Sequence, residues 1–245
     1  MARVAINGLG RIGRAVCKII LDTPDLELVA INDIVPASSL AYLLAYDTVY
    51  GRYDKSVAAE GDNLVIAGKQ YRVFSEQDPA ALPWGELGID IVMECSGAFT
   101  KKEGLQKHIE AGAKYAILSA PSKSDDIPTV VYGVNRVGDP SVRMISTASC
   151  TTNCITVVTE IMGRKIGIKK AALTAVHAFT ASQSLVDGPS KSPRRGRSGA
   201  ANLVPTSTGA AIATTRALPQ YEGLFDGVAV RAPVICGSIS DVIFV

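Results

Sequence analysis

The chain has 245 residues, of which 47% are hydrophobic and 20% charged, and its formal net charge is +2. This composition indicates a globular protein with enough apolar material for one large domain or two ordinary ones. The small net charge argues against a nucleic-acid partner or a membrane surface. No apolar run reaches the roughly 20 residues of a membrane span. Five scattered cysteines and two histidines predict neither a disulfide framework nor a metal site, so we expect a cytoplasmic protein.

A glycine-rich motif follows the first predicted strand. Residues 3–6 form a short β-branched run that leads into Asn7-Gly8-Leu9-Gly10-Arg11-Ile12-Gly13, after which apolar residues recur at helical spacing. A second strand is predicted over residues 26–32 and ends at Asp33. In this strand–turn–helix context the glycines allow a pyrophosphate to approach the helix N-terminus closely. Asp33 would accept hydrogen bonds from a ribose 2′-hydroxyl and repel a 2′-phosphate, which favours NAD over NADP. An ordinary glycine turn is the alternative.

Strands and helices continue to alternate up to about residue 148. We predict helices over residues 40–46 and 102–111, a hairpin over 63–74 with its turn at Ala67-Gly68-Lys69, and strands over 89–95, 115–119, 130–134 and 144–147. The apolar strand 89–95 ends at Ser96-Gly97, a turn at the carboxyl edge where open α/β sheets bind ligands. This order predicts a doubly wound, parallel Rossmann sheet over residues 1–148. His108 is expected to be a solvated helix residue.

The segment Ser-Thr-Ala-Ser-Cys-Thr-Thr-Asn-Cys, residues 146–154, is the candidate catalytic stretch. Ser149 is a natural N-cap for a helix expected over residues 154–165, with Thr151 and Thr152 in its first turn. At that position the helix dipole and unpaired N–H groups would favour the Cys150 thiolate and could hold an oxyanion. A capped helix with a small buried cysteine is the alternative. Cys154 is expected to be a packing residue, and a role as a redox partner is left open.

A second, α+β domain is predicted over residues 149–245. A half-buried strand over residues 170–179 carries His177 near its end, and residues 180–202 form an extended loop of the kind that is usually functional. A polar turn from residue 204 then opens a helix that ends near residue 218, and strands are expected over 227–232 and 239–245. Because the chain stops within a strand, this domain is expected to be truncated. The basic loop residues suit a phosphate or subunit contact better than nucleic acid; they are Lys191, Arg194, Arg195 and Arg197.

Four stretches resemble the phosphorylating glyceraldehyde-3-phosphate dehydrogenase family. They are residues 5–14, 176–180, 205–211 and the motif Ala148-Ser149-Cys150-Thr151-Thr152-Asn153-Cys154. The resemblance is collinear over the whole chain, although the family's chains are longer. It implies that a homotetramer converts glyceraldehyde 3-phosphate, NAD and inorganic phosphate to 1,3-bisphosphoglycerate and NADH, in glycolysis. It also implies that Cys150 is the nucleophile, through a thiohemiacetal and a thioester, and that His177 raises its reactivity and acts as the base.

The resemblance implies binding roles position by position. The residues that would bind NAD are Asn7, Gly8, Gly10, Arg11, Ile12, Gly13, Asp33, Gln77, Ser96, Gly97 and Ser119. The substrate's phosphate would be bound by Thr180, Arg195 and Arg231, and the attacking phosphate by Ser149, Thr151, Thr208 and Gly209. Hydroxyls, N–H groups and guanidinium groups suit a phosphate because each donates hydrogen bonds without having to lose a proton.

Three other functions stay open at this point. A related enzyme that oxidises erythrose 4-phosphate would hydrolyse its thioester instead of transferring it to phosphate. An incomplete chain would bind NAD without turnover. A thiol hydrolase built on Cys150 and His177 would leave the glycine motif and Asp33 without a role.

Overall fold

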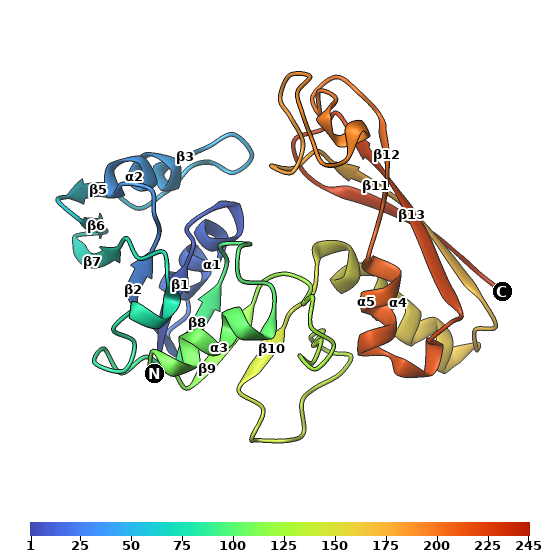
Figure 1. Cartoon of the computed structure of the whole chain (residues 1–245), viewed down its shortest axis with the longest axis horizontal. Helices are drawn as coiled ribbons and strands as arrows, with labels where there is room; N and C mark the ends of the chain where they lie inside the picture. The colour runs from blue at the N-terminus through green and yellow to red at the C-terminus, as the bar shows by residue number, and fades with distance from the viewer. The chain divides into compact units, whose positions relative to one another are not determined.

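The computed structural model describes all 245 residues, and these form two compact units (Figure 1). The first unit comprises Met1–Thr129 and Val137–Ala148, and the second comprises Val130–Arg136 and Ser149–Val245. Each unit has its own sheet and its own hydrophobic core. No helix is both long and apolar enough to cross a membrane.

The first unit is built on an eight-stranded sheet in the order β10-β9-β8-β1-β2-β7-β6-β5. Its parallel strands are β1 (Ala2–Asn7), β2 (Leu26–Asn32), β7 (Lys69–Phe74), β8 (Ile91–Glu94), β9 (Tyr115–Leu118) and β10 (Met144–Ser146). Strands β5 (Val57–Glu60) and β6 (Asn63–Ile66) extend one edge in antiparallel pairing. The chain passes from β1 to β2 on one side and later returns to β8 on the other. The order therefore reverses beside β1, at the kind of switch point where such sheets bind ligands.

Side chains on both faces of β1 are buried, as a doubly wound sheet requires. Val4 and Ile6 belong to one hydrophobic cluster, whereas Ala5 between them belongs to another. Helix α1 (Arg11–Asp22) buries Gly13, Cys17 and Ile20, and α2 (Ala37–Ala45) and α3 (Lys102–Glu110) follow. The short elements of this unit are the pair β3 (Tyr46–Asp47) and β4 (Gly51–Arg52) and the 3-10 helix η1 (Pro79–Ala81). The predicted α/β fold class is confirmed.

The predicted hairpin over residues 63–74 is present as β6 and β7. Its two turn residues, Ala67 and Gly68, have φ of 50° and 80°. Positive φ at both central positions is the geometry that joins antiparallel strands without splaying them apart. Strand β5 was not predicted, because its four residues alternate too briefly to be distinguished from a loop.

The prediction of a strand over residues 130–134 is wrong. The single β-bridge in this region is formed by the preceding residue, Thr129, with Ser146. The N–H of Val134 donates to Val131 O at 3.1 Å, and the N–H of Val131 donates to Asn135 Oδ1 at 2.8 Å. These local bonds close a turn around Gly133, whose φ is 81°. Turn chemistry at Gly133 and Asn135 therefore outweighs the β-propensity of the three valines in this segment.

The second unit has a four-stranded sheet in the order β12-β13-β11-β14. Strands β11 (Ala171–Ala178) and β13 (Phe225–Ala232) are parallel, whereas β12 (Val204–Ser207) and β14 (Ser238–Phe244) pair with them antiparallel. Helices α4 (Cys150–Lys165) and α5 (Ala210–Ala217) contribute Ile155, Ala210 and Ala211 to the core beneath this sheet. The 3-10 helices are η2 (Pro193–Gly196) and η3 (Pro219–Tyr221). Strand β12 lies where only a polar turn was predicted, because its pairing partner β13 is distant in sequence.

Candidate active site

The glycine turn of the first unit lies between β1 and α1. A Cβ on Gly8, whose φ is +90°, would lie 2.5 Å from Ser96 Cα, and a Cβ on Gly13 would lie 1.9 Å from the carbonyl oxygen of Gly8. Gly10 by contrast faces open space and is the N-cap of α1, with no side-chain hydrogen bond to the first turn. The N–H groups of that turn thus have no capping side chain, and uncapped N–H groups at a helix N-terminus suit a phosphate.

Asp33 lies beside the same turn. Its Oδ2 accepts a hydrogen bond from the N–H of Leu9 at 2.7 Å, and its Oδ1 accepts one from the N–H of Val35 at 2.9 Å. The carboxylate is thereby fixed at the end of β2 next to the glycines, as the sequence motif requires. The guanidinium of Arg11 pairs with Asp47, so the part of Arg11 left for a phosphate is its backbone N–H.

The other residues expected to bind the cofactor also lie at strand ends. Gln77 follows Glu76, whose N–H donates to Asn32 Oδ1 at 2.8 Å. Ser96 and Gly97 follow β8, and the hydroxyl of Ser119, after β9, donates to Glu94 O at 3.0 Å. Parallel strands bring their carboxyl ends to one edge of the sheet. The structure therefore places the strand-end residues Asn7, Ser96 and Ser119 along one edge, and Gln77 follows β7 by three residues.

The second unit brings Cys150 and His177 into contact. Cys150 is the first residue of α4 and is exposed, and its Sγ lies 3.3 Å from His177 Nε2. Ser149 caps the helix, as predicted, because its Oγ accepts from the N–H of Thr152 at 3.1 Å. The helix begins at Cys150, four residues before the expected start, so the thiol lies within its first turn.

Two groups compete for the other nitrogen of His177. Nδ1 lies 2.7 Å from the carbonyl oxygen of Ala178 and 2.8 Å from Nη1 of Arg231, which also donates to that carbonyl at 3.0 Å. A carbonyl accepts and a guanidinium only donates, so the two contacts correspond to different protonation states of Nδ1. With Nδ1 protonated, Nε2 can take the thiol proton; with Arg231 donating to Nδ1, Nε2–H donates to a thiolate. Both arrangements place one exchangeable proton between sulfur and imidazole.

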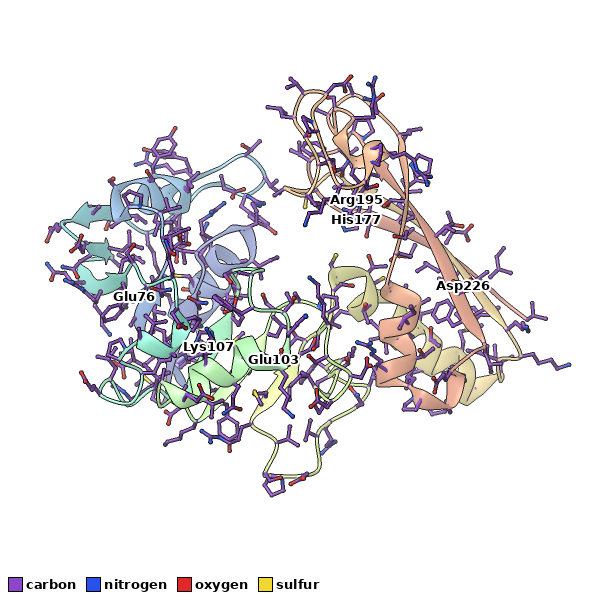
Figure 2. The ribbon with its side chains drawn as sticks, in the orientation of Figure 1. Glu76, Glu103, Lys107, His177, Arg195 and Asp226 are labelled. Carbon is purple, nitrogen blue, oxygen red and sulfur yellow. The ribbon has the colours of Figure 1, made fainter.

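Arg231 reaches His177 because the two residues are register partners in the parallel pair β11 and β13. Burial lowers the pKa of the Arg231 guanidinium, and the charge of Arg195 lowers it further, whereas Cys150 acts in the opposite direction. The Nε of Arg231 is buried and has no hydrogen-bond partner. Arg195 donates from Nε to Thr206 Oγ1 at 3.0 Å, and Figure 2 shows its position with that of His177. Two guanidinium groups that influence each other, one of them with an unused donor, are chemically suited to an anion.

The remaining predicted substrate residues have local partners. Thr180 Oγ1 lies 2.9 Å from Ser182 Oγ, and Thr208 Oγ1 accepts from the N–H of Ala210 at 3.1 Å, at the start of α5. Gly209 is the N-cap of α5 and faces open space, and Thr151 follows the catalytic cysteine with its hydroxyl 4.0 Å from Sγ. No hydrogen bond joins Thr208 or Gly209 to Cys150 or Arg231.

Two expectations about side chains are wrong. His108 is fully buried instead of solvated, because α3 turns Leu105 and His108, three residues apart, toward the interior, where Trp84 and Glu94 hydrogen-bond to the imidazole. Cys154 is exposed instead of packed in the core, and it forms no disulfide. Glu94, a fully buried carboxylate, was not among the predicted site residues, although an acid at the end of an apolar strand is a signal in the sequence.

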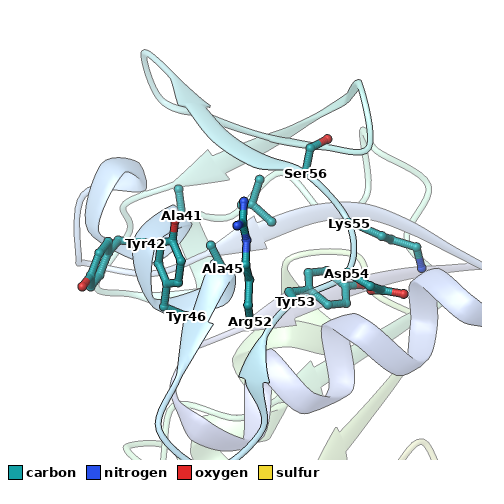
Figure 3. Close-up of a pocket in the computed structure, with 10 residues that line it drawn as sticks. Ala41, Tyr42, Ala45, Tyr46, Arg52, Tyr53, Asp54, Lys55 and Ser56 are labelled. Atoms are coloured by element: carbon teal, nitrogen blue, oxygen red, sulfur yellow. The ribbon is translucent and has the colours of Figure 1, made fainter.

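A hollow of about 650 Å³ lies on the first unit among α2, β4 and β5 (Figure 3). Its lining includes Tyr42, Tyr46, Arg52, Tyr53 and Lys55. None of the residues expected to bind cofactor or substrate is among them. The candidate chemistry therefore belongs to the sheet edge and to the Cys150 cluster, not to this hollow.

A chain that carries both a nucleotide-binding sheet edge and a cysteine–histidine pair falls in the class of NAD-dependent dehydrogenases that react through a thiol. The model of the glyceraldehyde 3-phosphate dehydrogenase NAD-binding domain matches residues 2–102, and that of the C-terminal domain of the same enzyme matches residues 149–245. The chain belongs to the glyceraldehyde-3-phosphate dehydrogenase family, as its motifs predicted, and its cofactor is NAD.

Curated relatives agree with this assignment. The glyceraldehyde-3-phosphate dehydrogenase of Clostridium acetobutylicum is 46% identical over 248 residues, covering 100% of this chain and 74% of the relative. That of Geobacillus stearothermophilus is 47% identical over 243 residues, covering 98% and 72%. Glyceraldehyde-3-phosphate dehydrogenase 1 of Bacillus subtilis is 46% identical over 243 residues with the same coverage. The chain is thus shorter than these relatives.

Proposed function

We propose that this chain oxidises D-glyceraldehyde 3-phosphate and phosphorylates the product to 1,3-bisphosphoglycerate, the glycolytic reaction of its family. The observation that carries the proposal is the 3.3 Å contact between Cys150 Sγ and His177 Nε2 at the capped start of α4. Bound NAD supplies the hydride acceptor. The uncapped first turn of α1 and the carboxylate of Asp33 are suited to hold its pyrophosphate and its adenosine ribose.

The first half of the reaction uses the proton shared by Cys150 and His177. The thiolate attacks the aldehyde carbon, a C–S bond forms, and the carbonyl oxygen takes the proton from Nε2 to give a thiohemiacetal. Nε2 then accepts the hydroxyl proton as hydride leaves the same carbon, and a thioester on Cys150 remains. The carbonyl of Ala178 can accept from the protonated Nδ1 during this step.

In the second half, inorganic phosphate attacks the thioester carbon. A C–O bond forms, the C–S bond breaks, and the sulfur leaves as the thiolate with which the cycle began. We assign the substrate's own phosphate to Arg231, Arg195 and Thr180. The two guanidinium groups give this part of the second unit the positive charge that a phosphate needs. The attacking phosphate is assigned to donors at two helix starts; these are Ser149, Thr151, Thr208 and Gly209.

The cofactor residues are proposed on the same basis. Arg11 and Ile12 donate backbone N–H groups to the pyrophosphate, with Gly8, Gly10 and Gly13 giving it room. Asp33 binds the adenosine ribose, and Ser119 lies toward the nicotinamide. Asn7, Gln77, Ser96 and Gly97 complete the edge. We accordingly assign cofactor binding to residues 1–148 and catalysis to residues 149–245.

The assay that tests the function follows NADH formation from D-glyceraldehyde 3-phosphate with and without inorganic phosphate. We expect oxidation that depends on phosphate and yields an acyl phosphate. Oxidation at the same rate without phosphate would contradict the proposal and favour a hydrolytic relative, for which erythrose 4-phosphate is the substrate to try next.

We also propose that the chain forms a homotetramer in the cytoplasm. Apolar side chains are exposed on the outer face of the second unit's sheet, among them Val176, Val228, Ile239 and Ile243, and such faces commonly mark interaction sites. Light scattering of the purified protein is expected to give four times the 25.7 kDa of one chain. A mass of one chain at micromolar concentration would contradict this assembly.

A further inference from the structure

The carboxylate of Glu94 is completely buried at the carboxyl end of β8 and makes four hydrogen bonds. Its Oε1 accepts from the N–H of Ser96 at 2.8 Å and from the Ser96 hydroxyl at 2.5 Å. Its Oε2 accepts from Asn7 Nδ2 at 2.5 Å and lies 3.0 Å from His108 Nε2. One side chain therefore joins the turn after β1 to the turn after β8.

The polarity of this network is fixed by Trp84. Its indole N–H, which can only donate, bonds to His108 Nδ1 at 3.1 Å. Nδ1 must then carry the lone pair, so Nε2 carries the proton and donates to Glu94. All four groups around Glu94 are donors, which matches an ionised carboxylate because that group only accepts. An amide at the same place would turn its NH₂ toward a donor.

The same network reaches the neighbouring strand ends. Asn32 donates from Nδ2 to Asn7 Oδ1 at 2.7 Å and accepts at Oδ1 from the N–H of Glu76 at 2.8 Å, one residue before Gln77. The backbone oxygen of Glu94 accepts from the hydroxyl of Ser119 at 3.0 Å. Hydrogen bonds centred on the buried side chains of Glu94, Asn7 and Asn32 thus connect the ends of five strands, β1, β2, β7, β8 and β9.

The turn at Gly8 and the turn at Ser96 are packed so closely that neither can shift without the other. The missing Cβ of Gly8 would lie 2.5 Å from Ser96 Cα, so the two turns touch through their backbones. A sideways movement of Ser96 would either separate the turns or press into Gly8. Bonds from Glu94 to both turns hold them at the spacing that this contact requires.

We propose that Glu94 is a positioning residue for NAD, and that His108 and Trp84 fix its orientation. This inference rests on the proposed use of the sheet edge for NAD. Glu94 itself is buried beneath the turns and acts through Asn7 and Ser96. Its role is to keep both turns in the arrangement that binds the dinucleotide before the dinucleotide arrives.

Calorimetric titration of NAD into the full chain and its Glu94→Gln variant tests this proposal. A buried donor left facing another donor costs about 1–3 kcal/mol, so we expect the Kd for NAD to rise about five- to 150-fold. Glu27→Gln is the matched control, because Glu27 is a carboxylate at the amino end of β2 that pairs with Arg3 and Lys69. That variant should bind NAD as the wild type does.

Milder variants keep the test decisive if Glu94→Gln does not fold. Trp84→Phe removes only the indole N–H, and His108→Gln keeps a donor that can reach Glu94, whereas His108→Leu removes it. We expect the Kd for NAD to rise with His108→Leu and Trp84→Phe and to be largely restored with His108→Gln. The alkylation rate of Cys150 by iodoacetamide without NAD should be unchanged in all of them, because the network does not include the second unit.

The outcomes separate the two ideas. If the wild type binds NAD and the folded variants bind it equally well, the positioning role is wrong while the proposed function stands. If the wild type itself binds no NAD, the proposed function fails and the positioning role fails with it. Equal loss of NAD affinity and of Cys150 alkylation would indicate general damage to the fold and would also overturn the positioning role.

Discussion

Cys150 and His177 become partners through the elements that carry them. Cys150 opens α4, His177 is the last residue but one of β11, and Arg231 is the register partner of His177 in β13. In the resulting cluster the imidazole of His177 contacts the thiol through one nitrogen and the guanidinium of Arg231 through the other. One proton is exchangeable between the thiol and the imidazole. A thiol in that setting can attack a carbonyl as thiolate and leave as thiolate, which both halves of the proposed reaction need.

Replacing the nucleophile should separate binding from chemistry. In Cys150→Ser the hydroxyl that replaces the thiol is far less acidic, so we expect NADH formation to fall to background. NAD binding should be unchanged, because the cofactor residues lie in the first unit. Steady-state assay and calorimetry measure the two quantities on one preparation. Turnover that survives in this variant would mean that the nucleophile is another residue.

The five cysteines should differ sharply in reactivity. Burial raises the pKa of Cys17 to about 12 and that of Cys95 to about 11, whereas Cys150, Cys154 and Cys236 are exposed. Iodoacetamide at pH 8 should therefore modify only the three exposed thiols, as read by peptide mass spectrometry. Rapid labelling of Cys17 in the folded chain would contradict its place in the core.

Because the pKa of Cys17 is raised in the folded state, the free energy of unfolding should decrease as the pH rises into the alkaline range. Its unfolded thiol ionises near pH 8.5–9 and its folded thiol near 12, so the stabilisation is complete below that window and is lost as pH rises through it. In Cys17→Ala, whose overall stability should be lower, the free energy of unfolding should fall less between pH 8 and 10.5 than in the wild type. An identical slope in both proteins, measured by urea unfolding, would rule this effect out.

At the scale of the element, α4 serves the site through its first turn. Ser149 accepts from the N–H of Thr152 and lies 2.7 Å from the Thr152 hydroxyl. The cap fixes where the helix starts and hence where Cys150 lies relative to the free N–H groups. The basic residues of its last turn, Arg164 and Lys165, complement the opposite end of the helix dipole.

Removing this cap should lower both the stability of the helix and the reactivity of the Cys150 thiol. Ser149→Ala is expected to lower the free energy of unfolding by about 1 kcal/mol and to slow alkylation of Cys150 near neutral pH. Ser192→Ala is the matched control, because Ser192 is the N-cap of η2 without a side-chain cap bond. Urea unfolding and the alkylation rate are the measurements, and equal effects of the two substitutions would show that the Ser149 cap contributes nothing particular.

At the scale of the whole molecule, the two units have separate cores and separate chemical tasks. The first unit contains the chain's single tryptophan, Trp84, which is fully buried. Its fluorescence therefore reports on the unit proposed to bind NAD, and alkylation of Cys150 reports on the other. The two probes allow the units to be followed independently in one sample.

NAD should stabilise the first unit by mass action. At a hundred times its Kd, a ligand that binds only the folded state adds about 2.7 kcal/mol to the free energy of unfolding. The unfolding transition followed by Trp84 emission should move to higher denaturant concentration by the corresponding amount. Adenosine alone, which lacks the pyrophosphate and the nicotinamide, is the control and should shift it less. No shift at saturating NAD would place the cofactor elsewhere.

The sequence by itself determined the features that depend on local spacing. Glycines at 8, 10 and 13 with Asp33 after the next strand predicted the nucleotide turn, and Ser149 predicted the cap beside Cys150. Alternating strands and helices predicted the doubly wound sheet. These features can be predicted because they depend on residues that are neighbours along the chain, which set the backbone conformation and the periodicity of the side chains.

Only the tertiary structure decided which distant groups meet. The burial of His108 depends on Trp84 and Glu94, the contact of Arg231 with His177 depends on strand register, and β12 exists because β13 is beside it. Residues 130–134 have the composition of a strand but close a turn instead. That turn is set by local bonds around Gly133, and its signal was present in the sequence. The other three outcomes are set by hydrogen bonds and burial between residues far apart in sequence, which no local pattern encodes.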